Sequence, residues 1–128
     1  MREPEFLSLE IVMDCHVESL TRYGGSDGVR DLGLIESALA SAQNTYHYAG
    51  GDLFDIAAAY AFHLAQAQAF LDGNKRTGVS AALTFLAGNG HVGIKDDGSL
   101  YDAMIAIAEK RMDKAGLAKT LRQLEKLR

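Results

Sequence analysis

Residues 72–76 read Asp-Gly-Asn-Lys-Arg and place an acid, a glycine, an amide and two adjacent cations between two alanine-rich runs. A glycine-containing loop that enters a helix presents unpaired backbone N–H groups at the positive end of the helix dipole, where anions bind. Lysine adds a compact charge and arginine a planar fork, and both side chains grip phosphate oxygens. The combination predicts a site for a nucleotide polyphosphate.

The chemistry of each side chain suggests its part in such a site. Gly73 removes a side chain that would block a ligand, and Asn74 can donate to an oxygen on which charge builds. Asp72 is a hard oxygen ligand suited to an Mg²⁺ ion that bridges phosphates. A second interpretation stays open, in which Asp72 caps a helix while Lys75 and Arg76 lie in solvent. A Walker loop is excluded, because Asn74 stands where that motif needs a glycine.

The length, composition and cysteine count limit the class of protein. The 128 residues suit one domain, 1–128, and a hydrophobic fraction of 48% with 23% charged residues is typical of a globular chain. No apolar run reaches the roughly 18 residues of a membrane span, and residues 1–6 do not resemble a signal peptide. The single cysteine, Cys15, cannot form an internal disulfide, so we expect a cytoplasmic protein.

The charge is unevenly distributed. The net charge of -4 argues against nucleic acid as a partner. Residues 109–128 nevertheless carry seven Lys or Arg against three Asp or Glu, which gives +4. Such a basic helix is more often a solvated face than a partner surface, and both interpretations are kept.

Apolar residues recur at helical spacing along the chain, without a good alternating strand run, and predict an all-α fold of about six helices. The first helix follows Ser8 and stops at residues 24–25, and the second follows Asp31, with an irregular link at 44–51. Asp52 caps a third helix that ends near residue 69 and is apolar nearly all round, hence central. Helices at 75–87, 100–110 and after Asp113 follow, with a short extended piece at 91–95. Ser99 and Asp102 resemble a capping box at the start of the fifth helix. On the apolar faces of the first, second and last helices, respectively, we expect Leu9, Val12, Met13, His16 and Leu20; Leu34, Ile35, Ala38, Leu39 and Ala42; and Leu117, Leu121 and Leu124.

Residues 70–77, Phe-Leu-Asp-Gly-Asn-Lys-Arg-Thr, resemble the signature of the death-on-curing toxins, the Doc branch of the Fic/Doc (Fido) superfamily. That signature is His-x-Phe-x-(Asp/Glu)-(Gly/Ala)-Asn-(Gly/Lys)-Arg. Segments at 22–25, 28–38, 52–55 and 85–90 also match the family in order and spacing, so the resemblance spans about residues 7–124. It implies the Fic/Doc fold and the transfer of part of a nucleotide to a hydroxyl of a target protein.

The resemblance also implies roles for individual residues. Asp72 would hold Mg²⁺, Gly73 and Asn74 would line an anion hole, Arg76 would grip phosphate, and Phe70 would anchor the loop. The phosphate-binding residues are then predicted to be Gly73, Asn74, Lys75, Arg76 and Thr77.

Lys75 stands where adenylylating Fic proteins carry glycine, and it marks the Doc branch. There the γ-phosphate of ATP is transferred instead of AMP, as in a protein kinase. By resemblance the target is a translation factor, elongation factor Tu, and residues 26–34 help to place it. The implied partner is a cognate antitoxin.

Position 68 departs from the family, because Gln68 replaces the histidine that removes the proton from the attacking hydroxyl. Glutamine orients a hydroxyl but does not accept its proton near neutral pH, and losing such a base costs on the order of 10²–10⁴-fold in rate. His63 lies more than a helical turn away, and His16 reads as a hydrogen-bonded core histidine. Natural drift and deliberate replacement both fit Gln68.

Three functions therefore stay open. We expect an impaired phosphotransferase, with a non-enzymatic nucleotide- or antitoxin-binding module, or an adenylyltransferase, as the alternatives.

Overall fold

The computed structural model describes residues 3–127, so Met1, Arg2 and Arg128 lie outside the described part. Its six helices are α1 (Leu9–Tyr23), α2 (Leu32–His47), α3 (Leu53–Ala67), α4 (Asn74–Gly88), α5 (Ser99–Ala108) and α6 (Lys114–Lys126). Within residues 3–127 there is no strand, only an isolated antiparallel bridge between Val29 and Phe70. The predicted all-α fold of about six helices is confirmed.

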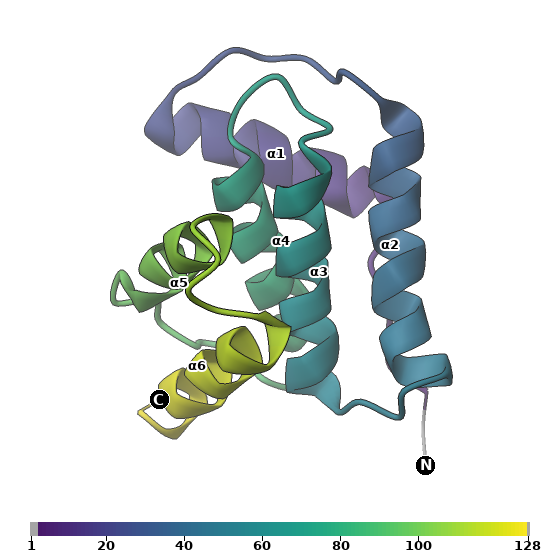
Figure 1. Cartoon of the computed structure of the whole chain (residues 1–128), viewed down its shortest axis with the longest axis vertical. Helices are drawn as coiled ribbons and strands as arrows, with labels where there is room; N and C mark the ends of the chain where they lie inside the picture. Colours follow the sequence, from purple (N-terminus) through teal and green to yellow (C-terminus); the bar gives the residue numbers. More distant parts are fainter. Residues whose placement is uncertain (1–2, 128) are drawn as a thin grey trace.

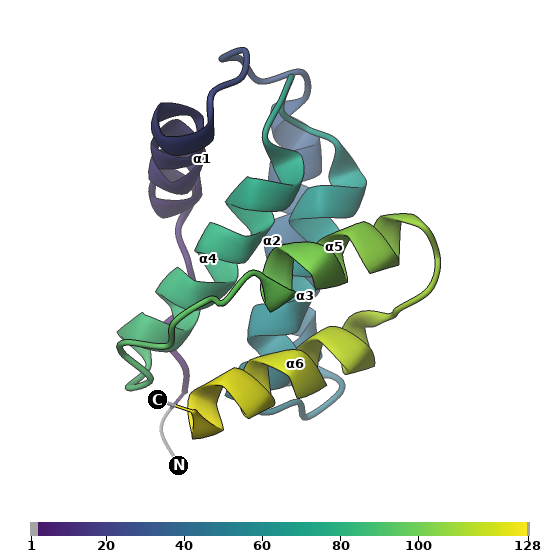
Figure 2. The ribbon, with the colours of Figure 1, turned by 90° about the vertical axis from the view of Figure 1, so that its left-hand side faces the viewer.

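The central helix is α3, which contacts α2, α4, α5 and α6 (Figure 1). Helix α1 runs across α4 (Figure 1), and α5 and α6 pack together against α3 (Figure 2). The α1–α2 connection and the α3–α4 loop meet at one end of the bundle. The arrangement brings residues 24–31 next to the loop that carries residues 68–73.

The core is built around α3, as its all-round apolar sequence predicts. Every residue from Ile56 to Ala61 is at most 1% exposed. Gly78 allows α4 to approach α3 closely, because a Cβ atom at this position would lie 2.8 Å from the Ala61 carbonyl oxygen. This close contact holds the start of α4, and therefore the Asp-Gly-Asn-Lys-Arg stretch, in a fixed place relative to the end of α3.

Four of the predicted caps are confirmed. The side chains of Ser8, Asp31, Asp52 and Asp113 accept hydrogen bonds from backbone N–H groups in the first turns of α1, α2, α3 and α6. These bonds satisfy donors that a helix start leaves without a partner. Gly24, with φ of 80°, ends α1 as expected.

The predicted capping box of Ser99 and Asp102 is wrong. Helix α5 begins at Ser99 itself, and its N-cap is Gly98, which offers no side chain. The first-turn donors are instead satisfied by two aspartates that precede the helix. Asp96 accepts from the backbone of Gly98 and Leu100, and Asp97 accepts from that of Ser99.

Two other boundaries differ from the sequence-based expectation. Helix α2 continues to His47, into the link predicted at 44–51. Its Tyr46 ring packs edge-on against that of Phe6, with ring centroids 6.0 Å apart, a contact that local sequence does not reveal. Within residues 91–95 there is a turn at Val92 and Gly93 and no strand. There the His91 backbone N–H donates to the Leu86 carbonyl, and the centroids of the His91 and Phe54 rings are 4.9 Å apart.

The buried faces follow the predicted stripes with a few exceptions. In α1 the buried positions are Val12, Cys15, His16 and Ser19, and in α6 they include Leu117, Leu121 and Leu124. Leu34 was expected on the inner face of α2, but it is 39% exposed. Within residues 3–127, none of the helices combines the length and apolar character that crossing a membrane requires.

Candidate nucleotide site

The loop at residues 68–73 is defined at both ends by left-handed backbone conformations. Gln68 ends α3 with φ of 53°, and Gly73 precedes α4 with φ of 74°. Between them Phe70 is 1% exposed and stacks on the His16 ring, with ring centroids 3.9 Å apart. Phe70 therefore anchors the loop in the core, which is the role that the family resemblance implied.

Asn74 closes this loop from the first turn of α4. Its Oδ1 accepts from the Phe70 backbone N–H, and its Nδ2 donates to the Phe70 carbonyl, both at 3.1 Å. The residue is 9% exposed. In this arrangement Asn74 shapes the loop, and its role as a donor to a charged oxygen stays a prediction.

The α1–α2 connection supports the loop from outside through backbone hydrogen bonds. Leu71 donates to Gly28 at 3.0 Å, and the Arg30 backbone donates to Ala69 at 2.7 Å. The Arg30 guanidinium also donates to the Gln68 carbonyl at 2.7 Å. Sequence reasoning missed Arg30, because no local spacing links it to a loop so far away along the chain.

His16 supports the loop from beneath. Its Nε2 lies 3.0 Å from the backbone oxygen of Asp72, and the residue is 1% exposed. The predicted hydrogen-bonded core histidine is thus confirmed, and its burial keeps the ring out of contact with a protein target in solvent. His63 instead contacts Lys114 at 3.2 Å, and burial together with that lysine charge lowers the pKa of His63.

The loop and its neighbours line a cavity of about 360 Å³, here called the loop cavity. It collects most of the predicted site residues from the α3–α4 connection and two tyrosines from other helices. Its lining comprises Tyr23, Gly24, Gln68, Leu71, Asp72, Gly73, Asn74, Lys75, Arg76 and Tyr101.

Thr77 is the predicted phosphate-binding residue that this cavity leaves out. It is 0% exposed, and its backbone N–H donates to the Gly73 carbonyl at 2.9 Å as the first bond of α4. Its Oγ1 is buried and has no hydrogen-bond partner within the described residues. We therefore expect the Thr77 side chain to make no contact with phosphate, against the sequence-based prediction, because its position one turn into α4 directs it to the interior.

Asp72 is exposed at the cavity, and its carboxylate is already oriented by the backbone. Oδ1 accepts from the Gly73 N–H at 3.0 Å, and Oδ2 accepts from the Ser26 N–H at 3.2 Å. In the described part of the chain no cluster of three or more His, Cys, Asp or Glu can hold a metal ion. A single carboxylate suits Mg²⁺, which keeps its waters and takes its remaining ligands from substrate phosphates.

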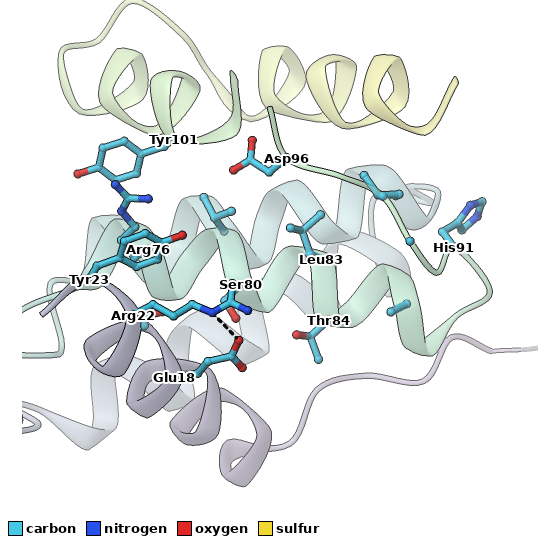
Figure 3. A pocket seen from close by; sticks show the side chains of 15 residues that line it. Glu18, Arg22, Tyr23, Arg76, Ser80, Leu83, Thr84, His91, Asp96 and Tyr101 are labelled. Carbon is cyan, nitrogen blue, oxygen red and sulfur yellow. Dashed lines mark ion pairs between the residues drawn. The ribbon is translucent and has the colours of Figure 1, made fainter. Parts of the chain in front are cut away.

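The two cations at the start of α4 differ in their surroundings. The half-buried Lys75 has no hydrogen-bond acceptor among residues 3–127. The Arg76 guanidinium carbon lies 3.8 Å from the ring centroids of both Tyr23 and Tyr101 (Figure 3). Sequence reasoning missed both tyrosines, since nothing in their spacing links the end of α1 and the start of α5 to the loop.

Gln68 lies at the rim of the loop cavity and is exposed. Its side-chain Nε2 donates to the Ala65 carbonyl at 3.0 Å, so the amide is turned back onto the end of α3. A carboxamide has no basic nitrogen, and none of the other cavity residues is a histidine. The lining of the cavity therefore contains two cations and a carboxylate, but no imidazole.

Comparison with known proteins identifies the family. The model described as the Fic/DOC family matches residues 6–86, which cover α1 to α3 and most of α4. The chain belongs to the Fic/DOC family. The family resemblance inferred from the loop signature is confirmed.

Two named Fic/DOC relatives extend the match. The phage protein "Protein kinase doc" of Escherichia phage P1 is 34% identical over 119 residues, which cover 92% of this chain and 94% of that protein. "Toxin Doc" of Mycolicibacterium smegmatis is 47% identical over 72 residues, which cover 53% of this chain and 54% of that protein.

Proposed function

We propose that this Fic/DOC protein is a Doc-type toxin whose loop cavity binds ATP together with Mg²⁺. The observation that carries the proposal is the meeting of Asp72, Lys75 and Arg76 around one cavity at the start of α4. The similarity of nearly the whole chain to a protein named as a kinase supports the choice of ATP.

The start of α4 offers the phosphate groups a set of backbone donors. The first helical bond runs from the Thr77 N–H to the Gly73 carbonyl, so the N–H groups of Asn74, Lys75 and Arg76 precede it. These donors lie at the positive end of the helix dipole, and two side-chain cations add to their attraction for an anion. Asp72 would hold Mg²⁺, which supplies charge neutralisation at the β- and γ-phosphates when bound.

The proposed reaction is phosphoryl transfer to a hydroxyl of a translation factor, elongation factor Tu by family resemblance. The bond between the γ-phosphorus and the β–γ bridging oxygen breaks, and a bond forms between that phosphorus and the target oxygen. ADP leaves, and the hydroxyl proton passes to a base. Lys75 and Arg76 stabilise the charge on the transferred group through Coulomb attraction and hydrogen bonds.

Because of Gln68, we expect the proton transfer to be the slow step of this reaction. Its amide cannot accept the proton, so water must take it, at a cost on the order of 10²–10⁴-fold in rate. The amide is also bonded to Ala65 rather than turned toward a target. This geometry supports the second candidate, a non-enzymatic module that keeps nucleotide or antitoxin binding.

The test is the Gln68→His variant incubated with ATP, Mg²⁺ and elongation factor Tu, followed by intact-mass spectrometry. The left-handed backbone at position 68 tolerates histidine and asparagine better than most residues, so Gln68→Asn is a matched control without a titrating group. We expect a mass gain of about 80 Da, one phosphate, with histidine only.

The alternatives predict different masses. A gain that corresponds to AMP identifies an adenylyltransferase, and it would contradict the role given to Lys75. No gain with histidine restored, together with intact ATP binding, would support the non-enzymatic module.

We further propose a cognate antitoxin as the protein partner, with an acidic or amphipathic docking segment. Several cations of the basic C-terminal stretch already have partners: Arg122 contacts Asp52 and Asp55, Lys114 contacts His63, and Arg111 contacts Glu109. Exposed cations at Lys110, Lys119 and Lys126 remain for a partner.

Co-expression of this chain with the adjacent gene product should give a complex that co-elutes in size-exclusion chromatography. A chain that elutes as a monomer whether or not that product is present would contradict this partner.

A further inference from the structure

Arg76 has an unusual environment for a half-buried arginine. Among residues 3–127 no carboxylate pairs with its guanidinium, and no acceptor takes a hydrogen bond from it. Its close contacts are instead the rings of Tyr23 and Tyr101, each with its centroid 3.8 Å from the guanidinium carbon. Figure 3 shows the two rings on either side of the Arg76 side chain.

This arrangement leaves the hydrogen-bonding edge of the guanidinium free. The group is planar, and its five N–H donors lie in that plane, whereas aromatic rings attract a cation through their faces. Two rings on either side therefore restrict the side chain without using its donors. Phosphate oxygens approach along the edge, where they accept two parallel N–H bonds.

The rings come from helices that are distant in the sequence. Tyr23 is the last residue of α1, and Tyr101 lies in the first turn of α5. Both line the loop cavity, and both also line a groove between α1, α4 and residues 91–96 (Figure 3). The stack of Tyr23, Arg76 and Tyr101 thus forms the common wall of the two spaces.

We propose that Tyr23 and Tyr101 are positioning residues, which hold the Arg76 guanidinium at the loop cavity before a phosphate arrives. An unrestrained arginine samples many rotamers, and ordering it during binding weakens affinity. Because the two rings order the Arg76 side chain before a ligand binds, this loss of affinity is avoided. The inference rests on the proposed function, because it assumes that Arg76 binds the phosphate groups of the nucleotide.

The test is a double-mutant cycle measured by calorimetric titration with ATP and Mg²⁺. We expect the Tyr23→Leu/Tyr101→Leu variant to raise the Kd about 4- to 25-fold, since each cation–π contact at a partly exposed site is worth about 2- to 5-fold. The Tyr23→Phe/Tyr101→Phe variant keeps both rings, so its Kd should stay within about 2-fold of the parent. In an Arg76→Ala background the leucine pair should cause no further loss.

A second probe separates positioning from direct contact with the nucleobase. Tripolyphosphate carries no base, so the leucine pair should weaken its binding by the same factor as it weakens ATP binding. A loss seen with ATP alone would mean that the rings stack on adenine, and it would overturn the positioning role. An equal loss in the Arg76→Ala background would overturn it too.

The cycle also distinguishes the inference from the proposed function. Unchanged ATP affinity in the Arg76→Ala single variant would contradict the phosphate site itself. A loss in that variant with none in the leucine pair would contradict only the positioning role. Tyr23 is 57% exposed, so Tyr23→Leu alone is not expected to disturb folding, and it should still show the loss of one ring.

Discussion

Asn74 should be the residue on which the loop at 68–73 depends most for its shape. Its amide is the hydrogen-bond partner of both the N–H and the carbonyl of Phe70, and Phe70 is 1% exposed. In Asn74→Ala both groups lose that partner. A buried polar group left unsatisfied costs about 1–3 kcal/mol. Because partial hydration relieves some of this loss, we expect the free energy of unfolding to fall by about 2–4 kcal/mol.

The measurement is urea denaturation followed by far-UV circular dichroism, with the slope m compared between variants. Asn44 provides the matched control, because it is an exposed asparagine within α2. Asn44→Ala should change the free energy of unfolding by less than about 0.5 kcal/mol. Asn74→Asp keeps the acceptor for the Phe70 N–H but turns an oxygen toward the Phe70 carbonyl, so at neutral pH it should be no more stable than Asn74→Ala.

The same variant should bind ATP more weakly, since the loop sets the positions of Asp72 and Gly73. A stability loss below about 1 kcal/mol in Asn74→Ala would refute the reasoning, because it would mean that water replaces the amide without strain. Full ATP affinity in a variant that loses the expected stability would show that the phosphate site does not depend on the loop geometry.

Three further outcomes are expected. Gly78→Ala should lower the free energy of unfolding by about 1–3 kcal/mol, because its Cβ would meet the backbone of α3, whereas Gly88→Ala enters open space and should raise it by about 0.5–1 kcal/mol in thermal or urea unfolding. Thr77→Val should retain stability within about 1 kcal/mol and leave the Kd for ATP unchanged in calorimetry, since its hydroxyl is buried without a partner. Burial alone would raise the pKa of Asp52, but hydrogen bonds from a backbone N–H and from Arg122 outweigh it and lower the pKa below 3.8. Its contribution to stability is therefore present above about pH 3.8 and lost as the pH falls through the lower folded pKa, so urea unfolding of Asp52→Asn between pH 5 and 2 should show a shallower acid dependence than the parent.

The helices could be predicted because their signals are local. The caps at Ser8, Asp31, Asp52 and Asp113 each act on an N–H group three residues away. The apolar character of α3 on all its sides can likewise be read from neighbouring residues. The capping box at Ser99 failed through local bonds to Asp96 and Asp97, whereas the end of α2 was missed because a distant contact decides it. Helix α2 extends to His47 where Tyr46 packs on Phe6, and no periodicity within residues 44–51 shows that partner.

The candidate site divides in the same way. The types and order of Asp72 to Arg76 predict a phosphate site, and the structure confirms only that these residues line one cavity. The sequence also placed Thr77 at this site, but Thr77 does not line the loop cavity, because its burial depends on how α4 packs rather than on its place in the signature. Arg30 contacts the loop at the Gln68 carbonyl and His16 contacts it at the backbone oxygen of Asp72. These two contacts could be identified only from the tertiary structure.

By itself the sequence determined the helices, the family, and the absence of a titrating group at Gln68, since these depend on side-chain chemistry and spacing along the chain. Only the tertiary structure decided which side chains support that chemistry. Asn74 turns toward Phe70, and Arg76 lies between Tyr23 and Tyr101, because helices far apart in the sequence pack against the same loop. Hydrogen bonds and ring contacts of a few ångströms depend on that packing, which no local pattern of residues records.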